Sequence, residues 1–189
     1  MLNSPFERFL GTCRKRYMAH LAQATLAARE QHPDVVTELA LRLNCETENE
    51  RFALVRIDLA WTEDNTTELA NAELDPLEGP NTQERHRFSC RGIEVAAQPF
   101  GWHACSITLT PTPHSWEAIW RWFDDWFDIE ERRPPDDAGF GGVVHRLSKL
   151  DIHEGSCQLL VDFGSAPVSA VTELLAGCRS GGVESATLE

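Results

Sequence analysis

Residues 116–127 read WEAIWRWFDDWF, and this tryptophan-rich stretch decides how the second half of the chain is built. Ser115, just before it, is a preferred helix N-cap, and Glu117 lies in the first turn, where a carboxylate interacts favourably with the helix dipole. On a helical wheel its main apolar side chains span about 100°, the width that covers a sheet. We therefore predict a helix from Trp116 to about Asp128, with one face packed on a sheet.

Alternating apolar and polar residues on both sides of this helix predict four strands, and a second apolar stripe predicts a helix within residues 168–178. The strand-like segments are residues 105–110, 143–150, 157–163 and 183–188. The resulting order, strand-helix-strand-strand-helix-strand, is that of the ferredoxin-like split β-α-β-β-α-β unit. Right-handed crossovers would place the first and third strands centrally, with both helices on one face. We expect residues 105–189 to form this unit.

The first half of the chain predicts one long helix on antiparallel strands. Ser4-Pro5-Phe6-Glu7 has the form of a capping box, and apolar residues recur at helical spacing to about Arg29. Residues 34–44 fit either a short helix or a strand, and the polar loop that follows favours the strand. Further segments are strands at 53–61 and 68–74, a loop at 75–81, and a hairpin at 85–90 and 93–97.

These patterns together predict an α+β protein with two regions. Residues 1–104 form an N-terminal helix and an antiparallel β region, and residues 105–189 form the ferredoxin-like unit. We expect the two regions to pack as one integrated structure, because the tryptophan-rich helix carries more apolar surface than its own sheet can cover.

The charge is −13 over 189 residues and is unevenly distributed. Residues 34–84 contain 13 acidic and three basic residues, a net charge of −10, and residues 114–137 contain eight and three, a net charge of −5. Such surfaces repel a phosphate backbone, so we expect no nucleic-acid partner. The apolar runs are far shorter than the roughly 18 residues that span a bilayer, and the N-terminus lacks the apolar core of a secretory signal. We therefore expect no membrane partner and a cytoplasmic location.

The sequence carries no recognisable cofactor motif. Its six cysteines include no C-x-x-C pair, which argues against a zinc or thiol-exchange site. P-loop, dinucleotide-binding and hydrolase-elbow patterns are absent as well. We expect no cofactor, and the balance of these observations favours a protein that is not an enzyme.

Asp124, Asp125 and Asp128 spell D-D-x-x-D, the aspartate-rich motif that binds magnesium-diphosphate in isoprenoid synthases. The spacing places three carboxylates on one helical face, as a hard cation requires. Those enzymes, however, are larger all-helical proteins with two such motifs, whereas half of this chain is predicted to be strand. We interpret the three aspartates as an exposed acidic face.

An enzymatic alternative would draw metal or substrate ligands from a small set of histidines and aspartates. No H-E-x-x-H or H-x-H spacing groups them in the sequence. Asp162 is the most site-like of them, since it lies near the end of a predicted central strand. The candidates are His103, His145, His153, Asp151 and Asp162.

Trp122 and Trp126 extend the apolar arc of the helix to about 200°, more than one sheet can cover. Either the N-terminal half packs over them or they anchor a partner, since tryptophan is enriched at interface hot spots. With the three aspartates they form the predicted interaction surface. The leading hypothesis is a regulatory or inhibitory, immunity-like protein that binds a protein partner with a basic surface. A homo-oligomer that buries both tryptophans across a two-fold axis is a further alternative.

Overall fold

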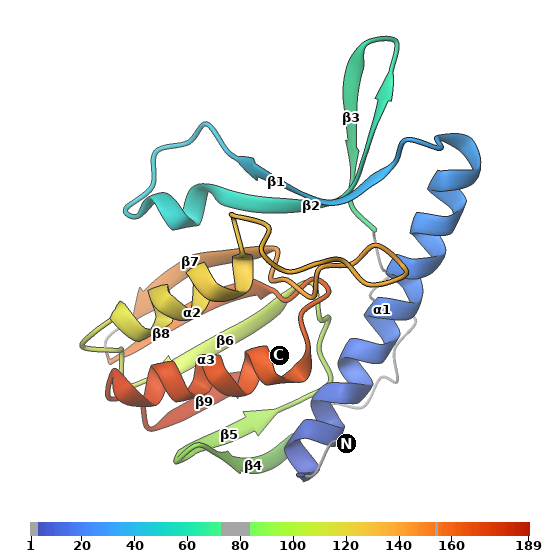
Figure 1. Ribbon diagram of the computed structural model, residues 1–189. Helices are drawn as coiled ribbons and strands as arrows, with labels where there is room; N and C mark the ends of the chain where they lie inside the picture. The colour runs from blue at the N-terminus through green and yellow to red at the C-terminus, as the bar shows by residue number, and fades with distance from the viewer. Residues whose placement is uncertain (1–3, 73–83, 154) are drawn as a thin grey trace.

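The computed structural model describes residues 4–72, 84–153 and 155–189, and the loop predicted at 75–81 lies outside them (Figure 1). Within this part of the chain the fold is α+β, with three α-helices and one nine-stranded, mostly antiparallel sheet. The helices are α1 (Pro5–Gln31), α2 (Glu117–Phe127) and α3 (Val168–Ser180), with a 3₁₀ helix η1 (Glu50–Ala53). The strands are β1 (Val36–Arg42), β2 (Leu54–Glu63), β3 (Thr66–Ala70), β4 (His86–Cys90), β5 (Ile93–Ala97), β6 (Cys105–Thr110), β7 (Arg146–His153), β8 (Ser156–Asp162) and β9 (Ser185–Leu188).

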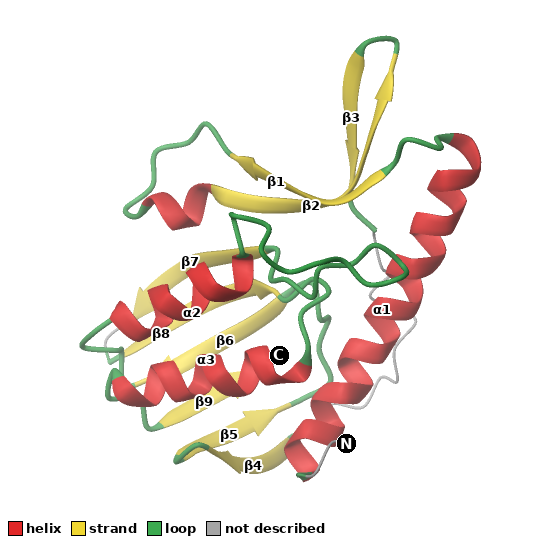
Figure 2. Ribbon diagram, in the orientation of Figure 1, coloured by secondary structure: helices red, strands yellow, loops and turns green. Residues whose placement is uncertain are grey.

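The strands follow the order β1-β2-β7-β8-β6-β9-β5-β4, and β3 pairs with β2 outside this path. Neighbours are antiparallel except β5 and β9, which are parallel. Helices α2 and α3 lie side by side on one face of the central strands, and α1 runs along one side of the molecule (Figure 2). The β2–β3 hairpin projects away from this body (Figure 1).

The core lies between the central strands and the two helices that cover them. Alternate residues of β6 and β8 are buried, among them Ile107 and Leu159, which belong to the same apolar cluster as Leu174 and Leu175 of α3. Burying a side chain of this size contributes roughly 1.5–3 kcal/mol. The other residues of these strands are half-buried or, at Thr110, exposed, so the helices cover one face of the sheet.

Helix α1 begins as its sequence predicts. The Ser4 hydroxyl accepts a hydrogen bond from the Glu7 amide (3.1 Å), and the Glu7 carboxylate accepts one from the Ser4 amide (2.9 Å), which completes the capping box. The helix ends at Gln31, and its buried residues, spaced at helical intervals, include Leu10, Tyr17 and Leu21. This face attaches α1 to the body.

Most predicted segments have the predicted type and differ from the structure in their bounds by a few residues. Residues 36–42 form a strand, which is the alternative that the sequence favoured over a short helix. The strand predicted at 68–74 lies earlier, because Asp64 and Asn65 both adopt positive φ and make a two-residue hairpin turn. The strand predicted at 143–150 begins later in the structure. The Val144 amide donates its hydrogen bond to the Trp126 carbonyl, and not to a neighbouring strand. β7 then runs through most of the turn predicted at 151–155, with a register shift before Asp151.

Candidate functional site

The surplus apolar arc of α2 is covered from within the chain, by α3 and the segment after α2. Trp122 Nε1 donates a hydrogen bond to the Ala170 carbonyl (2.8 Å), and Trp126 Nε1 donates one to Glu173 Oε2 (2.9 Å). The Arg133 guanidinium lies 4.0 Å above the Trp126 ring. Both indoles are buried, so in this arrangement they do not form an exposed surface.

The three aspartates of the D-D-x-x-D stretch have three different environments. Asp124 is exposed and accepts two hydrogen bonds from the Arg51 guanidinium (2.7 and 2.6 Å), while Asp125 is exposed. Asp128 is buried and accepts from the backbone amides of Arg132 (3.2 Å) and Arg133 (2.8 Å). Burial raises the pKa of Asp128, but these hydrogen bonds outweigh burial and lower it. Asp128 therefore organises the turn after α2.

The densest buried chemistry surrounds His145, just before β7. His145 Nε2 lies 2.8 Å from Glu38 Oε1, and Nδ1 lies 2.9 Å from Asp58 Oδ1 and 3.9 Å from Asp162 Oδ2. The Tyr17 hydroxyl donates a hydrogen bond to Asp58 Oδ1 (2.9 Å). We call Tyr17, Glu38, Asp58, His145 and Asp162 the central cluster.

The central cluster joins five parts of the chain, namely α1, β1, β2, β8 and the segment before β7. The carboxylates have backbone partners as well: Asp58 Oδ2 accepts from the Ala72 amide (2.7 Å), and Glu38 Oε2 accepts from the Gly141 amide (2.6 Å). Among the described residues, Val55 and Arg146 are the only ladder pair between β2 and β7. Side-chain contacts therefore carry much of this junction.

Charges within the central cluster hold a proton on His145. Burial by itself lowers the pKa of His145, but the charge of Asp162 and the contacts with Asp58 and Glu38 outweigh it and raise the pKa to about 10. Burial raises the pKa of Asp162 to about 6, and His145 opposes that rise. The pKa of Asp58 is lowered, because its contacts with His145, Ala72 and Tyr17 outweigh its own burial. Burial and the neighbouring carboxylates raise the pKa of Tyr17, so its hydroxyl stays protonated.

Two backbone positions allow this packing. Glu38 is buried and has a φ of 57° within β1, a left-handed conformation that costs a non-glycine residue about 1–3 kcal/mol. Gly164 has a φ of 49°, and a Cβ at this position would lie 2.1 Å from His145 Cδ2. Glycine is therefore required beside the imidazole, where the backbone passes the ring face.

Arg56 on β2 ties the central cluster to the end of α2. Its guanidinium donates to the carbonyls of Phe127 (2.8 Å), Glu38 (2.6 Å) and Asp128 (2.7 Å). Carbonyls at a helix C-terminus lack helical partners and carry partial negative charge, so a cation there is stabilising. A cleft of about 380 Å³ lies over Glu38, Arg56 and Asp128. Each of these three charges already has a partner within the chain.

The central cluster holds its imidazole in the protonated form. A protonated imidazole has no lone pair for a metal ion or for accepting a proton. No group of three or more His, Cys, Asp or Glu residues within the described ranges is arranged to hold a metal ion. Neither the imidazole nor the tyrosine hydroxyl is poised as a nucleophile.

Of the five predicted ligand residues, the structure brings His145 and Asp162 together. His103 stacks on Tyr17, with ring centroids 5.7 Å apart, and burial lowers its pKa. Asp151 and His153 lie farther along β7, paired with Gln158 and Ser156 of β8.

Sequence reasoning missed Tyr17, Glu38 and Asp58 as members of the cluster. A signal for Asp58 existed, because it is a carboxylate in the middle of a strand that is otherwise largely apolar. Tyr17 and Glu38 had no comparable local signal.

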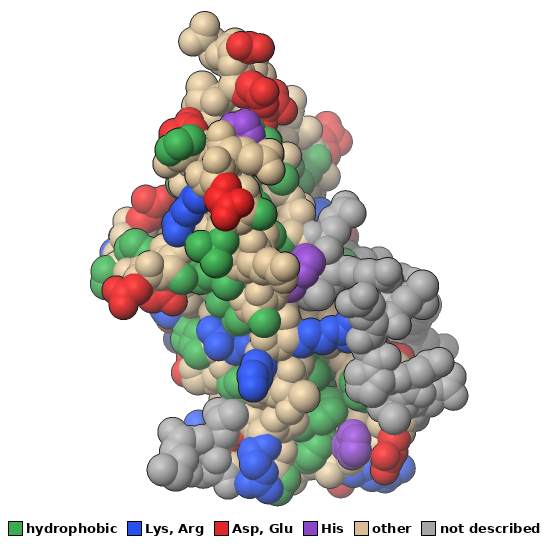
Figure 3. Space-filling view, turned by 90° about the vertical axis from the view of Figure 1, so that its right-hand side faces the viewer, with side chains coloured by type: hydrophobic (Ala, Val, Ile, Leu, Met, Phe, Trp, Pro, Cys, Tyr) green, Lys and Arg blue, Asp and Glu red, His purple; other side chains and the backbone are tan. Residues whose placement is uncertain are grey.

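The strands and loops of residues 34–72 form a second distinctive feature, which we call the acidic arm. It contains β1, η1, β2 and β3, and its β2–β3 hairpin forms the projecting tip (Figure 1). Carboxylates are visible around this tip in Figure 3. The exposed acidic residues of the arm are Asp34, Glu46, Glu48, Glu50, Glu63, Asp64 and Glu68.

Comparisons with known proteins do not assign either feature. No protein-family model matches the chain, and none of the curated proteins or solved structures compared with it is significantly similar. Of the helices that the structure describes, none combines the length and the apolar character needed to cross a bilayer.

Proposed function

We propose that this chain is a regulatory or inhibitory, immunity-like interaction module that presents its acidic arm to a basic surface of a partner protein. The supporting observation is the charge of the arm. Within residues 34–72, all of which the structure describes, seven carboxylates are exposed against one exposed guanidinium, that of Arg42. Complementary charge of this kind increases association rates and selects among partners.

The shape of the acidic arm also supports binding. Strand β3 is exposed along nearly its whole length, and the hairpin projects from the body, so a partner can approach it from several sides. The central cluster and Arg56 fix the base of the arm through buried contacts. A rigid base lowers the conformational entropy that binding must remove.

The paired charges of the central cluster favour this function over catalysis. Its protonated imidazole is held between carboxylates, and the charges under the cleft are held by backbone groups. In this proposal the partner is a protein and not a nucleic acid, and the complex forms in the cytoplasm. The role predicted for Trp122 and Trp126 becomes structural support, while Asp124 and Asp125 add to the exposed acidic surface.

We also infer that residues 105–189 form a ferredoxin-like split β-α-β-β-α-β unit that is integrated with residues 1–104. The strand order β7-β8-β6-β9, with antiparallel neighbours and with β6 and β8 inside, supports this assignment. Helices α2 and α3 on one face support it as well. In this view the acidic arm is an addition at the β7 edge of the unit.

Charge reversal at the tip tests the interaction directly. The tagged wild-type protein and a Glu63→Lys/Glu68→Lys variant are used to capture partners from an extract of the source cells. The best captured protein is then purified, and its affinity for both forms is measured by calorimetry at two salt concentrations. We expect a basic partner whose affinity falls at least about tenfold in the variant and weakens with salt.

A Glu94→Lys/Glu184→Lys variant is the matched control, because it makes the same change in net charge at exposed positions outside the arm. It should bind the partner nearly as well as the wild type. Equal affinity of the wild type and the tip variant for every captured protein would contradict the proposal. A stoichiometric metal in the untagged purified protein would favour the enzymatic alternative.

A further inference from the structure

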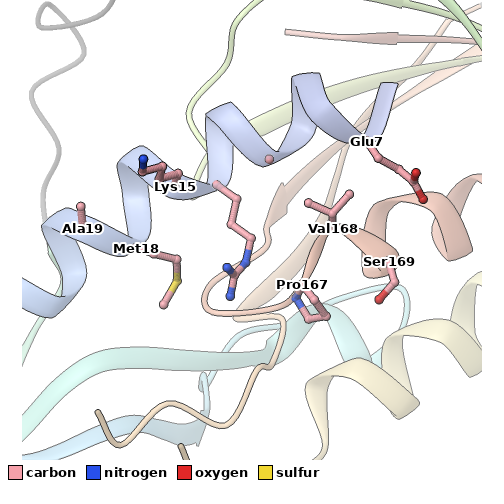
Figure 4. A pocket seen from close by; sticks show the side chains of 9 residues that line it. Glu7, Lys15, Met18, Ala19, Pro167, Val168 and Ser169 are labelled. Carbon is pink, nitrogen blue, oxygen red and sulfur yellow. The ribbon is translucent and has the colours of Figure 1, made fainter. Parts of the chain in front are cut away.

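A groove of about 700 Å³ separates the N-terminal half of α1 from the start of α3 (Figure 4). Met18 on α1 and Pro167 at the start of α3 lie on its two sides. Val168 contributes to an apolar floor, and Arg14 and Lys15 add positive charge, with Glu7 at one end. The groove therefore combines an apolar surface with a basic border.

Arg14 belongs to the wall of the groove. Its Nε donates to the Ala166 carbonyl and its Nη2 donates to the Ser165 carbonyl, both at 2.8 Å, which fixes α1 against the start of α3. Neutral carbonyls accept these hydrogen bonds, so the guanidinium keeps its positive charge in the wall. Lys15 is exposed, and Arg8, also exposed, lies two helical turns earlier on the same side of α1.

Helix α1 is the basic element of a strongly acidic protein. Five of its residues are basic and two are acidic, whereas the whole chain carries a net charge of −13. The acidic arm lies at the C-terminal end of α1, and the groove lies beside its N-terminal half (Figure 1). In Figure 3 carboxylates gather at the upper end of one face and Lys and Arg side chains over its middle and lower parts.

A surface that is acidic at one end and basic at the other is complementary to itself under a two-fold rotation. Such a rotation places each acidic end on the other copy's basic end, so that one contact occurs twice. We propose that the groove between α1 and α3 accepts the acidic β2–β3 tip of a second copy, in a reciprocal two-fold dimer.

This inference rests on the proposed function in one respect, since it assigns a second role to the acidic arm. Pairing between copies covers the tip, and a basic partner must then compete with the groove of the second copy. Dimerisation therefore regulates access to the arm. The dimer requires no other protein, so it is testable with the purified chain alone.

The first measurement is the mass of the purified protein by size exclusion with light scattering, over a range of protein and salt concentrations. We expect a dimer at low salt that dissociates as the salt concentration rises, because exposed charge pairs are screened beyond about 10 Å at 0.1 M salt. A monomer at every concentration and at low salt would overturn the inference.

Charge exchange between the two surfaces gives the sharper test. The groove variant Arg8→Glu/Lys15→Glu and the tip variant Glu63→Lys/Glu68→Lys should each weaken the dimer at least about tenfold. An equimolar mixture of the two should form a heterodimer. In that heterodimer one contact has wild-type charges on both sides and the other has both charges reversed, so both contacts are attractive.

The Glu94→Lys/Glu184→Lys variant serves again as the control and should remain dimeric, with circular dichroism confirming that all variants are folded. A dimer that tolerates both single-surface variants would overturn the groove assignment, as would a mixture that stays monomeric. These outcomes are separate from the partner test. A monomeric protein that still binds a basic partner through its tip retains the proposed function, whereas a dimer without such a partner retains only this inference.

Discussion

The base and the tip of the acidic arm use the same residue types in opposite ways. At the base Glu38 and Asp58 are buried. Their carboxylate oxygens lie 2.8 and 2.9 Å from the two ring nitrogens of His145. At the tip Glu63 and Glu68 are exposed on a projecting hairpin. Burial, and not composition, therefore decides whether a carboxylate of this arm joins parts of the fold or remains available to a partner.

The same comparison explains how a nearly detached hairpin keeps its position. Hydrogen bonds between strands contribute little at the junction of β2 and β7, where the described residues show one ladder pair. The central cluster and Arg56 supply buried contacts from α1, β1, the end of α2 and the loop at Gly141. Disturbing the base should therefore change the whole fold, while disturbing the tip should change only binding.

The largest effect is expected for Asp58→Ala at the base. This change leaves the Tyr17 hydroxyl and the Ala72 amide without their acceptor and removes one of the three carboxylates around the His145 imidazole. Removing one partner of a buried ion pair destabilises a protein by about 3–5 kcal/mol. Urea denaturation monitored by tryptophan fluorescence measures the loss.

Glu63→Ala is the control for Asp58→Ala, because it removes a carboxylate from the exposed end of the same strand. Its free energy of unfolding should lie within about 0.5 kcal/mol of the wild type. If both variants lose the same stability, the contrast between base and tip is wrong.

The second effect is a loss of stability at alkaline pH. The pKa of His145, about 10 in the folded state, lies above its ordinary value of 6.5. The folded state thus holds the proton more tightly, so this stabilisation is complete below about pH 6.5 and is lost as the pH rises toward 10. The free energy of unfolding should fall by up to about 1.4 kcal/mol for each pH unit between about pH 6.5 and 10.

The variant Glu38→Gln isolates the part of this pH dependence that belongs to His145. The amide keeps the side chain in place but removes one negative charge, so the pKa of His145 should fall toward its ordinary value. Buried cysteines with raised pKa values, such as Cys178 at about 12, contribute in the same direction in both proteins. Identical pH profiles for the variant and the wild type would show that His145 does not hold its proton in this way.

The features that the sequence predicted correctly depend on residues that are close together in the chain. The capping box at Ser4 and Glu7, the hairpin at Arg91-Gly92 and the apolar face of α2 depend on residues a few positions apart. Periodicity and turn chemistry report such relations directly. Helix and strand types were therefore predictable, while several bounds moved by a few residues.

The central cluster was not predictable for the opposite reason. Tyr17 and Asp58 are 41 residues apart, and Glu38 and His145 are 107 residues apart. Apart from Asp58, a carboxylate within a largely apolar strand, these residues have no distinctive local pattern, and only the pairing of distant strands brings them together. The same holds for Trp122, because a helical wheel measures an apolar arc but does not identify α3 as the element that covers it.

A smaller effect is expected where the backbone passes His145. Gly164→Ala places a Cβ within 2.1 Å of the imidazole at a φ of 49°, so it combines a steric clash with backbone strain. Gly142→Ala carries backbone strain alone, since its φ is 68° and no atom lies within 4 Å of the added Cβ. We expect a loss of about 1 kcal/mol for Gly142→Ala and about 1–3 kcal/mol more for Gly164→Ala. Thermal unfolding of the two variants measures the difference, and equal losses would mean that the ring moves aside without cost.

The smallest effect is expected at the tip, and it completes the comparison. Glu63 and Glu68 are exposed, so the Glu63→Lys/Glu68→Lys variant should change the free energy of unfolding by no more than about 1 kcal/mol. Amide hydrogen exchange should show the same gradient in the wild type, with fast exchange in β3 and slow exchange at Val55 and Arg56 beside the central cluster. A tip whose reversal destabilises the fold as much as Asp58→Ala would have to be packed against the body, and such a tip would have no surface left for a partner or a second copy.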